Sequence, residues 1–408
     1  MELEVYLVGG AVRDELLGLK PTEKDYVVIG ATPEDMLAQG FKPVGKDFPI
    51  FLHPVTKEEY ALARTERKVA PGYHGFEFRT DPSITLAEDL ARRDLTINAI
   101  ALSADGLSII DPYNGVADIE NRILRHVSDA FVEDPIRVLR LARFAARFKK
   151  MGFQIAPETL ELANTLRRAG ELNALVPERV WKETWKALAE NNPEEYFHVL
   201  RSCGGLSILF PELEALFGIP SVIQEKHFMD SGMHALLSLS NAARLSPLPE
   251  TRFAALMHSV GKGKILPQKW PVLENYQDYS EDILLSLAEK YKIPKHVKEI
   301  AKIVASHHQL WLTANTAESL LHFFEITDAL RRTERFSNIV RACEACFITH
   351  KDKQHSEFLI EVLLKLQKQL KALKPTLINV GQPLKAVYQQ AKLRSLNKIL
   401  QEQKIIAH

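Results

Sequence analysis

Cysteine is scarce in this chain of 408 residues, and the three that occur, Cys203, Cys343 and Cys346, are too few for a disulfide framework. Cys343 and Cys346 have the spacing of half a zinc site, but no second pair exists and their surroundings are helical, so a structural role is favoured. Long apolar runs are also missing, and the opening Met1–Glu4 lacks the basic residues of a secretion signal. These absences predict a cytoplasmic protein with no membrane partner.

An excess of charge of one sign is absent as well. The 52 Lys and Arg residues balance 52 Asp and Glu residues, which argues against indiscriminate nucleic-acid binding but leaves room for a local basic surface. The length allows two to four domains with a sizeable core. Residues 351–408 are richer in Lys and Arg than in Asp and Glu, which suits either a solvated face or contact with a nucleic-acid backbone.

The pattern of apolar residues changes near Pro112. Beyond it, apolar residues recur with the 3.6-residue spacing of helices, interrupted by prolines. Before it, short β-like runs alternate with turns. We therefore predict an α+β fold, with an N-terminal α/β head followed by an all-helical remainder. The predicted strands are Tyr6–Val8, Tyr26–Ile29, Pro43–Val44, Ile50–Leu52, Glu59–Leu62 and Leu107–Ile110.

The stretch Tyr6–Gly30 predicts a strand, a turn at Gly9-Gly10, a short helix and a second strand. Backbone N–H groups at such a helix start can bind an anion, and Arg13 adds a positive charge there. Glu23 and Asp25 project to one side at the entry of the second strand. Two carboxylates that face a phosphate-binding turn suggest a Mg²⁺ site. The alternative is a surface ion pair with Lys24 after an ordinary turn.

A second cluster is the segment Arg92–Asn98, RRDLTIN. Planar guanidinium groups match phosphate oxygens at two points, so Arg92 and Arg93 could clamp a triphosphate. Asp94 could orient one of them, and Asn98 could bond a sugar or cap a turn. Read alone, the same residues also suit a surface salt bridge.

A third cluster begins at Glu133-Asp134-Pro135, which marks a helix start. One stripe of this helix carries arginines that would repel one another unless an anion or another carboxylate lies opposite, and we favour contact with a ligand over a plain solvated face. Asp134 and Arg137 could present an acceptor and a donor edge to a nucleobase. The stripe consists of Arg137, Arg140, Arg143 and Arg147.

In their order and spacing, these motifs resemble the class II tRNA nucleotidyltransferases, the CCA-adding enzymes related to bacterial poly(A) polymerases. The segments Glu178–Glu183, ERVWKE, and Gly261–Gly263, GKG, extend the resemblance over most of the chain. It implies a nucleotidyltransferase head at residues 1–140, a helical neck at 141–205, a His-Asp phosphohydrolase-like body at 206–340 and a basic helical tail at 341–408.

The resemblance also implies an activity. Such enzymes add C, C and A to the 3′ end of tRNA from CTP and ATP without a template, using Mg²⁺ and releasing pyrophosphate. A monomer or a dimer is expected. Alternatives are a poly(A) polymerase or A-only enzyme with the same head, and a weakly active tRNA-binding relative.

Carried over by position, the resemblance assigns roles to individual residues. Glu23 and Asp25 would bind the metal, with Glu59 as a third catalytic carboxylate. Asp134 and Arg137 would read the Watson–Crick edge of the incoming base. Thr65–Thr85 looks like the mobile loop that helps to switch from C to A addition. The remaining nucleotide-binding residues would be Gly10, Arg13, Arg93, Arg140 and Arg143.

The chain departs from the family pattern in two places. Glu23 replaces the first aspartate of the usual Asp-x-Asp pair, so reduced activity is possible because small misplacements slow in-line reactions. In the body, Ser259 and Gln309 stand where metal-binding aspartates are expected. We therefore predict a body that keeps its helical fold without the hydrolase metal site. His234 and His258 would remain as packed or solvated side chains.

Overall fold

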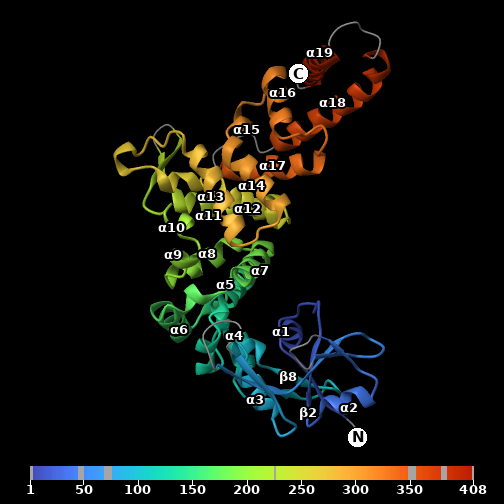
Figure 1. Cartoon of the computed structure of the whole chain (residues 1–408), viewed down its shortest axis with the longest axis vertical. Coiled ribbons are helices and arrows are strands. Elements are labelled where there is room, and N and C mark those ends of the chain that lie inside the picture. The colour runs from blue at the N-terminus through green and yellow to red at the C-terminus, as the bar shows by residue number, and fades with distance from the viewer. Residues whose placement is uncertain are drawn as a thin grey trace. The chain divides into compact units, whose positions relative to one another are not determined.

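The computed structural model describes residues 3–44, 50–68, 76–224, 227–347, 355–377 and 384–406. The chain divides into two compact units, Met1–Leu209 and Phe210–His408 (Figure 1). The first unit contains the only large sheet of the described residues, and helices dominate thereafter. The prediction of a mixed head followed by a helical remainder is confirmed, while the finer division into four domains stays a prediction.

The head is built on a seven-stranded sheet in the order β3-β4-β5-β2-β1-β8-β9. Strands β1 and β2 are antiparallel, whereas β2 and β5 run parallel. Every strand predicted from the sequence belongs to this sheet. The strands are β1 (Glu4–Val8), β2 (Asp25–Ile29), β3 (Lys42–Val44), β4 (Ile50–Leu52), β5 (Glu59–Leu62), β8 (Ala101–Ser103) and β9 (Ile109–Ile110).

Both faces of the sheet are covered, because successive side chains of a strand point to opposite sides. Val27 packs with Val8 and Leu90 in one apolar cluster. Its neighbour Val28 packs with Met36 in another. Helices α2 and α3 begin with capping boxes that satisfy their first N–H groups. The head helices are α1 (Gly10–Leu16), α2 (Pro33–Ala38), α3 (Leu86–Ala91) and α4 (Gly115–Asn121).

The predicted mobile loop Thr65–Thr85 is only partly a loop. Its two ends form the antiparallel strands β6 (Arg64–Lys68) and β7 (Phe76–Thr80). The sequence prediction missed them because charged residues replace the apolar runs that mark most strands. Residues 69–75, which include most of the glycine-rich centre, lie outside the described part of the chain.

The rest of the first unit is largely helical. Prolines occupy the first turn of α6, α7 and α8, where the missing N–H is not needed. The expectation of an all-helical neck is corrected by the short parallel pair β10 (Ile123–Leu124) and β11 (Gln154–Ile155). The helices are α5 (Ile136–Phe148), α6 (Pro157–Arg168), α7 (Pro177–Ala189), α8 (Pro193–Ser202) and α9 (Leu206–Leu209).

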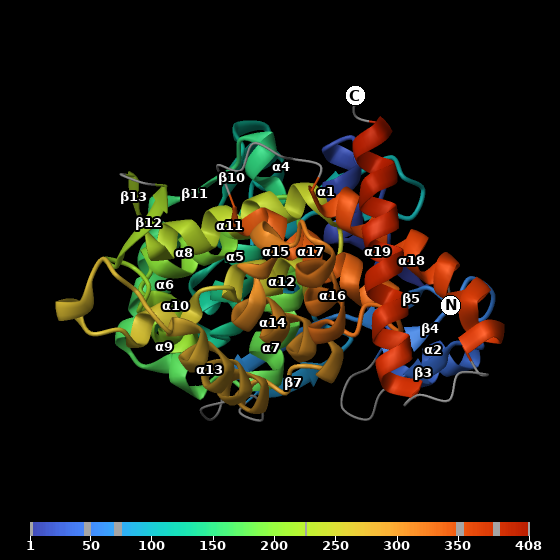
Figure 2. The same cartoon turned by 90° about the horizontal axis from the view of Figure 1, so that it is seen from above.

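The second unit is also largely rather than entirely helical. A hairpin of β12 (Pro220–Gln224) and β13 (His227–Asp230) precedes its longer helices. Helices α18 and α19 lie side by side at the C-terminal end (Figures 1 and 2). The helices are α10 (Pro211–Glu214), α11 (Ser231–Leu245), α12 (Pro249–Met257), α13 (Tyr276–Lys290), α14 (Lys295–His307), α15 (Leu310–Thr313), α16 (Ala317–Ile326), α17 (Thr333–Cys346), α18 (His355–Leu377) and α19 (Leu384–Ile406).

Two expectations from composition can be compared with this fold. Cys343 and Cys346 are unbridged residues of α17, and both are buried in the core of the second unit. Among the described helices, none combines the length and apolar content needed to cross a membrane.

Candidate active site in the head

A cavity of about 500 Å³ opens in the first unit, lined by residues of the head and of helices α5 and α7. It brings together residues that the sequence placed in separate motifs. Of the predicted site residues, only Glu59 is not part of its lining. Those that line it are Gly10, Arg13, Glu23, Asp25, Arg93, Asp134, Arg137, Arg140 and Arg143.

The turn before α1 requires glycine for a steric reason. Gly9 has φ +73, and a Cβ there would lie 2.7 Å from Nη1 of Arg93. The Arg93 guanidinium therefore lies against the turn, and its Nη1 donates to the carbonyl oxygen of Asn98 at 3.5 Å. The bare backbone and this arginine form one wall of the cavity.

Arg13 is held rigidly beneath the turn. Its side chain is buried, and Nε and Nη2 donate to Oδ1 of Asp14 at 2.9 and 2.7 Å. Nη1 donates to Oδ1 of Asn98. The guanidinium carbon also lies 5.1 Å from the Phe144 ring centre and 5.2 Å from that of Phe148. The sequence thus correctly placed a fixed positive charge near the glycine turn.

The acid that orients Arg92 and Arg93 is Asp89, not Asp94 as expected. Asp89 is fully buried in α3 and lies 2.7 Å from Nη2 of Arg92 and 3.4 Å from Nη2 of Arg93. The sequence contained this signal, because Asp89 precedes the arginines by one helical turn.

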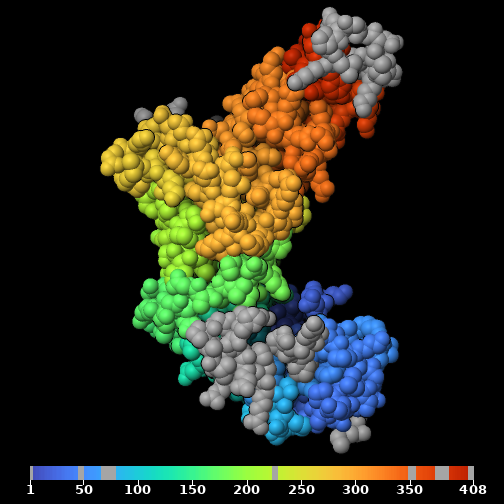
Figure 3. All heavy atoms as spheres, in the orientation of Figure 1, coloured from blue at the N-terminus to red at the C-terminus, as the bar shows by residue number. Residues whose placement is uncertain are grey.

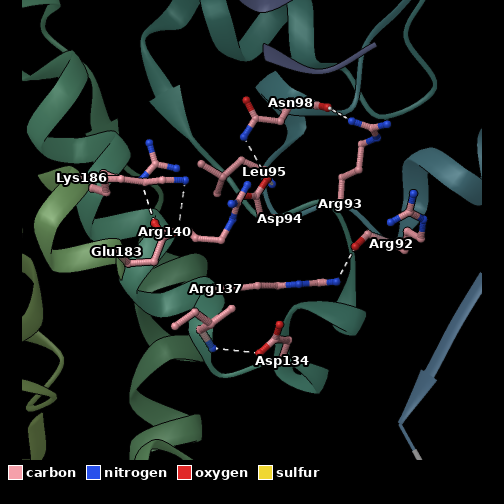
Figure 4. Close-up of polar contacts among 12 residues, drawn as sticks. Arg92, Arg93, Asp94, Leu95, Asn98, Asp134, Arg137, Arg140, Glu183 and Lys186 are labelled. Atoms are coloured by element: carbon pink, nitrogen blue, oxygen red, sulfur yellow. Dashed lines mark hydrogen bonds and ion pairs between the residues drawn. The ribbon is translucent and has the colours of Figure 1, made fainter. Parts of the chain in front are cut away.

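Asp94 instead joins the head to α5. Its carboxylate accepts from Nε of Arg140 at 2.7 Å and from Nδ2 of Asn98 at 2.9 Å (Figure 4). Burial alone would raise the pKa of Asp94, but the charge of Arg140 and these two hydrogen bonds outweigh it and hold the pKa well below its usual range. Asp94 is therefore a permanent anion that orients Arg140.

Arg140, Arg143 and Arg147 of the α5 stripe face carboxylates, one of the two kinds of partner that the sequence analysis required opposite them, while contact with a ligand stays a prediction. Arg143 Nε lies 2.8 Å from Oε2 of Glu183, a residue of α7. Arg147 Nη2 lies 2.8 Å from Oδ2 of Asp14. All of these arginines still line the cavity, so their charges are anchored by acids without being withdrawn from it.

The predicted base-reading pair, Asp134 and Arg137, is also fixed by hydrogen bonds within the protein. Asp134 accepts from Nη2 of Arg179 at 2.8 Å and from the backbone N–H of Ile136 at 3.1 Å. Arg137 donates to the carbonyl oxygens of Ala130, at 2.8 Å, and of Arg92 (Figure 4). Arg179 was noticed only as part of a family motif, and its partner lies 45 residues away.

Glu23 and Asp25 line the same cavity, and both residues are exposed. Partial loss of hydration raises the pKa of Asp25, the charge of Glu23 adds to this rise, and Arg93 opposes it. In the described part of the chain, no ion pair joins Lys24 to either carboxylate, so the surface-pair alternative is not supported. Two neighbouring carboxylates of this kind fit Mg²⁺, which takes hard oxygen ligands and completes its shell with substrate phosphates and water.

Glu59 lies on the strand next to Asp25 but does not line the cavity. Its Cα is paired with that of Asp25 across the parallel strands β5 and β2, which places both side chains on one face. Across the described residues, no group of three or more His, Cys, Asp or Glu is arranged to hold a metal ion. The third carboxylate therefore stays a prediction.

The body residues singled out from the sequence lie in the second unit. His234 and His258 are buried with ring centres 4.9 Å apart, and the ring of His308 lies 5.2 Å from that of His258. Of the two fates expected, packing rather than solvation is correct. The Ser259 hydroxyl is buried without a hydrogen-bond partner.

Comparison with known families matches residues 5–125 to the poly A polymerase head domain and residues 152–217 to the probable RNA and SrmB-binding site of polymerase A. Over 344 residues the chain is 53% identical to the multifunctional CCA proteins of three Acinetobacter baumannii strains, covering 84% of this chain and 83% of theirs.

Solved structures support the same fold. The Bacillus stearothermophilus CCA-adding enzyme in complex with CTP has a TM-score of 0.67 and 23% identity, covering 99% of this chain and 94% of that one. The Thermotoga maritima CCA-adding enzyme complexed with tRNA has a TM-score of 0.63 and 22% identity, covering 100% of this chain and 92% of that one. The chain therefore belongs to the class II CCA-adding enzymes, the CCA tRNA nucleotidyltransferases.

Proposed function

We propose that the head cavity is where this chain adds C, C and A to the 3′ end of tRNA, with CTP and ATP as substrates and Mg²⁺ held by Glu23 and Asp25. The observation that carries this assignment is the shared cavity itself, which combines two carboxylates with a row of arginines anchored by acids. Such a site offers oxygen ligands to a cation and guanidinium groups to a triphosphate. A cytoplasmic location is part of the proposal, because CTP and ATP are available there.

The triphosphate would lie against the glycine turn. Gly10 leaves the backbone open to close approach, and Arg93 presents its guanidinium beside the turn. Arg13 contributes a charge that cannot swing away, because Asp14 and Asn98 hold it. These groups stabilise the negative charge that develops as pyrophosphate departs.

The metal would be held by Glu23 and Asp25, which lie just before and at the start of β2. When bound, Mg²⁺ supplies charge neutralisation on the phosphates and a lower pKa for the attacking hydroxyl. Asp25 is fixed by strand pairing, and Glu23 reaches from the segment before the strand. Glu59 would join them as a third carboxylate from the neighbouring strand. The 3′-hydroxyl of tRNA then attacks the α-phosphorus, and the bond to pyrophosphate breaks.

The base would be read by Asp134 and Arg137. Asp134 accepts hydrogen bonds and Arg137 donates them, which suits the edges that cytosine and adenine present. Arg179 and the backbone carbonyls fix both side chains before any nucleotide arrives. Arg140 and Arg143 complete the pocket, and Asp94 and Glu183 set their orientation.

The test is incorporation of each nucleoside triphosphate into tRNA that lacks its CCA end, with and without Mg²⁺. We expect CTP and then ATP to be added, with no addition of GTP or UTP. Extension by ATP alone would favour an A-only enzyme. Binding of tRNA without Mg²⁺-dependent incorporation would reduce the chain to a non-catalytic relative. Glu120→Gln, which changes an exposed carboxylate of α4 outside the cavity, is the matched control.

A further inference from the structure

Lys186 differs from the other cations of the head cavity. It is the one lysine among the described residues that line the cavity, and it belongs to α7. In the described part of the chain its nearest acid is Glu183, whose Oε1 lies 4.0 Å from Nζ (Figure 4). The other oxygen of that carboxylate, Oε2, lies 2.8 Å from Nε of Arg143. Lys186 therefore shares an acid that a neighbouring arginine holds more closely.

Helix α7 packs beside α5 and contributes to both ends of the cavity. Near its start, Arg179 holds Asp134 at the proposed base-reading end. Lys186 follows Arg179 by seven residues, so the two share a face of α7 and lie about 10 Å apart along the helix axis. One turn beyond Lys186, Oε1 of Glu190 lies 3.7 Å from Nη1 of Arg143. Lys186 is thus level with Arg143 and away from the base-reading pair.

The Arg143 end of the cavity adjoins the glycine turn. Arg147, one turn after Arg143 on α5, lies 2.8 Å from Oδ2 of Asp14. Oδ1 of the same carboxylate accepts from Arg13, which lies beneath the turn where we place the triphosphate. A nucleotide whose base is read at the opposite end therefore extends its phosphates toward Lys186.

The charges around Lys186 favour an anion. Partial burial lowers the pKa of Lys186, and the charges of Arg143, Lys182 and Arg140 lower it further, although Glu183 opposes them. The shared carboxylate therefore does not neutralise the local positive charge. Lysine also carries its charge on a flexible four-carbon stem, so its ammonium group can follow an anion that moves.

A lysine of the second unit provides a contrast. A second cavity, of about 370 Å³, lies wholly within that unit, and the segment between residues 265 and 275 projects beside it, in yellow in Figures 1 and 3. Lys262 of this cavity is buried, and its Nζ donates to Oγ of Ser221 at 2.6 Å, which fixes its position. The Lys186 side chain is 48% exposed, which leaves its ammonium group room to move.

We propose that Lys186 binds the terminal phosphates of the incoming CTP or ATP and follows pyrophosphate as it departs. The proposal rests on the proposed function and adds a residue to that site. Pyrophosphate gains negative charge as its bond to the α-phosphorus breaks, and a mobile ammonium group stabilises that charge. The terminal phosphates are common to both nucleotides, so this contact serves C and A addition alike and does not select the base.

The first experiment measures binding of CTP, ATP and CMP to the full-length protein by calorimetry in Mg²⁺. Because the lysine is half exposed, its loss in Lys186→Met should weaken CTP and ATP binding equally, by about three- to tenfold. Affinity for CMP, which lacks the terminal phosphates, should be unchanged, and this also shows that the variant folds. Lys182→Met is the matched control, because Lys182 is exposed one turn earlier on α7 and outside the cavity lining.

The second experiment follows incorporation into tRNA that lacks its CCA end. Lys186→Met should raise KM for CTP and weaken product inhibition by pyrophosphate, while KM for tRNA is unchanged. Lys186→Arg, which keeps the charge, should recover most of the affinity. If wild-type protein binds CTP but incorporates no nucleotide, the proposed function fails, whereas the binding comparison still decides the role of Lys186.

Three results would overturn the role of Lys186. The first is equal CTP affinity in wild type and Lys186→Met. The second is an equal loss of CTP and CMP affinity, which would show that the variant disturbs the whole cavity. The third is a raised KM for tRNA with nucleotide affinity unchanged, which would assign Lys186 to the tRNA backbone.

Discussion

The two cavities of this chain differ in the partners of their positively charged side chains. In the head, Arg140, Arg143 and Arg147 each have an acid within 2.8 Å. In the body, Lys262 has a hydroxyl and an aromatic ring but no carboxylate in the described lining. The head therefore keeps its charges fixed in the absence of a ligand, while the body weakens its charge by lowering a pKa.

The two arrangements have different consequences for an incoming anion. An arginine held by an acid is already aimed, so a substrate phosphate meets a prepared donor. A lysine buried without a counter-ion is destabilised until an anion arrives. The head is accordingly suited to catalysis, whereas the body holds a buried lysine whose described neighbours include no carboxylate.

The largest effect is expected from the carboxylate that strand pairing fixes. Asp25→Asn removes one carboxylate oxygen that we propose binds the metal, at a position held by β1 and β5. We expect nucleotide incorporation to fall by at least about a hundredfold, the loss that even a 1 Å misplacement can cause. Single-turnover incorporation of CTP measures it, with Glu120→Gln as control. Near-normal activity in Asp25→Asn would remove this residue from the metal site.

The second unit should lose stability at a higher pH than the first unit as the solution is acidified. Burial lowers the pKa of His234 and His308 to about 4, so the folded body holds them neutral while the unfolded chain protonates them near pH 6.5. Their contribution to stability is present above about pH 6.5 and is lost as the pH falls toward 4, on the order of 3 kcal/mol for each. The pKa of Asp94 in the head is depressed, so its contribution is lost only below the ordinary carboxyl range.

Hydrogen exchange at about pH 5, corrected for intrinsic rates, measures this comparison. Peptides from residues 210–408 should lose protection before those from 1–209. The head also contains His126, whose pKa burial lowers, but this side chain is only half-buried. Simultaneous loss of protection in both units would contradict the assigned histidine contribution.

The sequence predicted what depends on local pattern. Short apolar runs bounded by turns identified most strands of the sheet, and glycine and arginine motifs identified most of the cavity lining. It missed the strands Arg64–Lys68 and Phe76–Thr80, because neither contains an apolar run. Asp89 was missed although it lies one helical turn from its arginines.

Other features could not be read from local pattern. Arg140 meets Asp94 across 46 residues, and Arg147 meets Asp14 across 133. No periodicity connects residues so far apart, so the partners of the arginine stripe depended on the tertiary fold. Lys186, which lines the head cavity, was missed for the same reason. In the body, no acid lies among the described residues around Lys262, and this is a property of packing, since acids are plentiful in the sequence.

A moderate effect is expected from Asp134, the proposed base-reading acid. Asp134→Ala removes the acceptor that Arg179 holds in place. A paired base contact contributes roughly 1–3 kcal/mol of discrimination, so selection of CTP and ATP over UTP and GTP should fall by about five- to a hundredfold. Competition between triphosphates in one reaction measures the ratio. If all four nucleotides slow equally, Asp134 stabilises the fold and does not read the base.

The smallest effect is expected at Glu23, because its setting differs from that of Asp25. Glu23 precedes β2 and lies outside any helix or strand, whereas Asp25 is the first residue of that strand. Glu23→Asp keeps the carboxylate oxygens and shortens the side chain by one methylene, a change that unpaired backbone can absorb. Activity should stay the same or rise, within about tenfold, while the Mg²⁺ concentration for half-maximal rate shifts. Glu23→Gln, which keeps the length and removes the charge, should lose more activity. If the two variants lose activity equally, side-chain length at this position matters as much as charge, and the segment before β2 is as rigid as the strand.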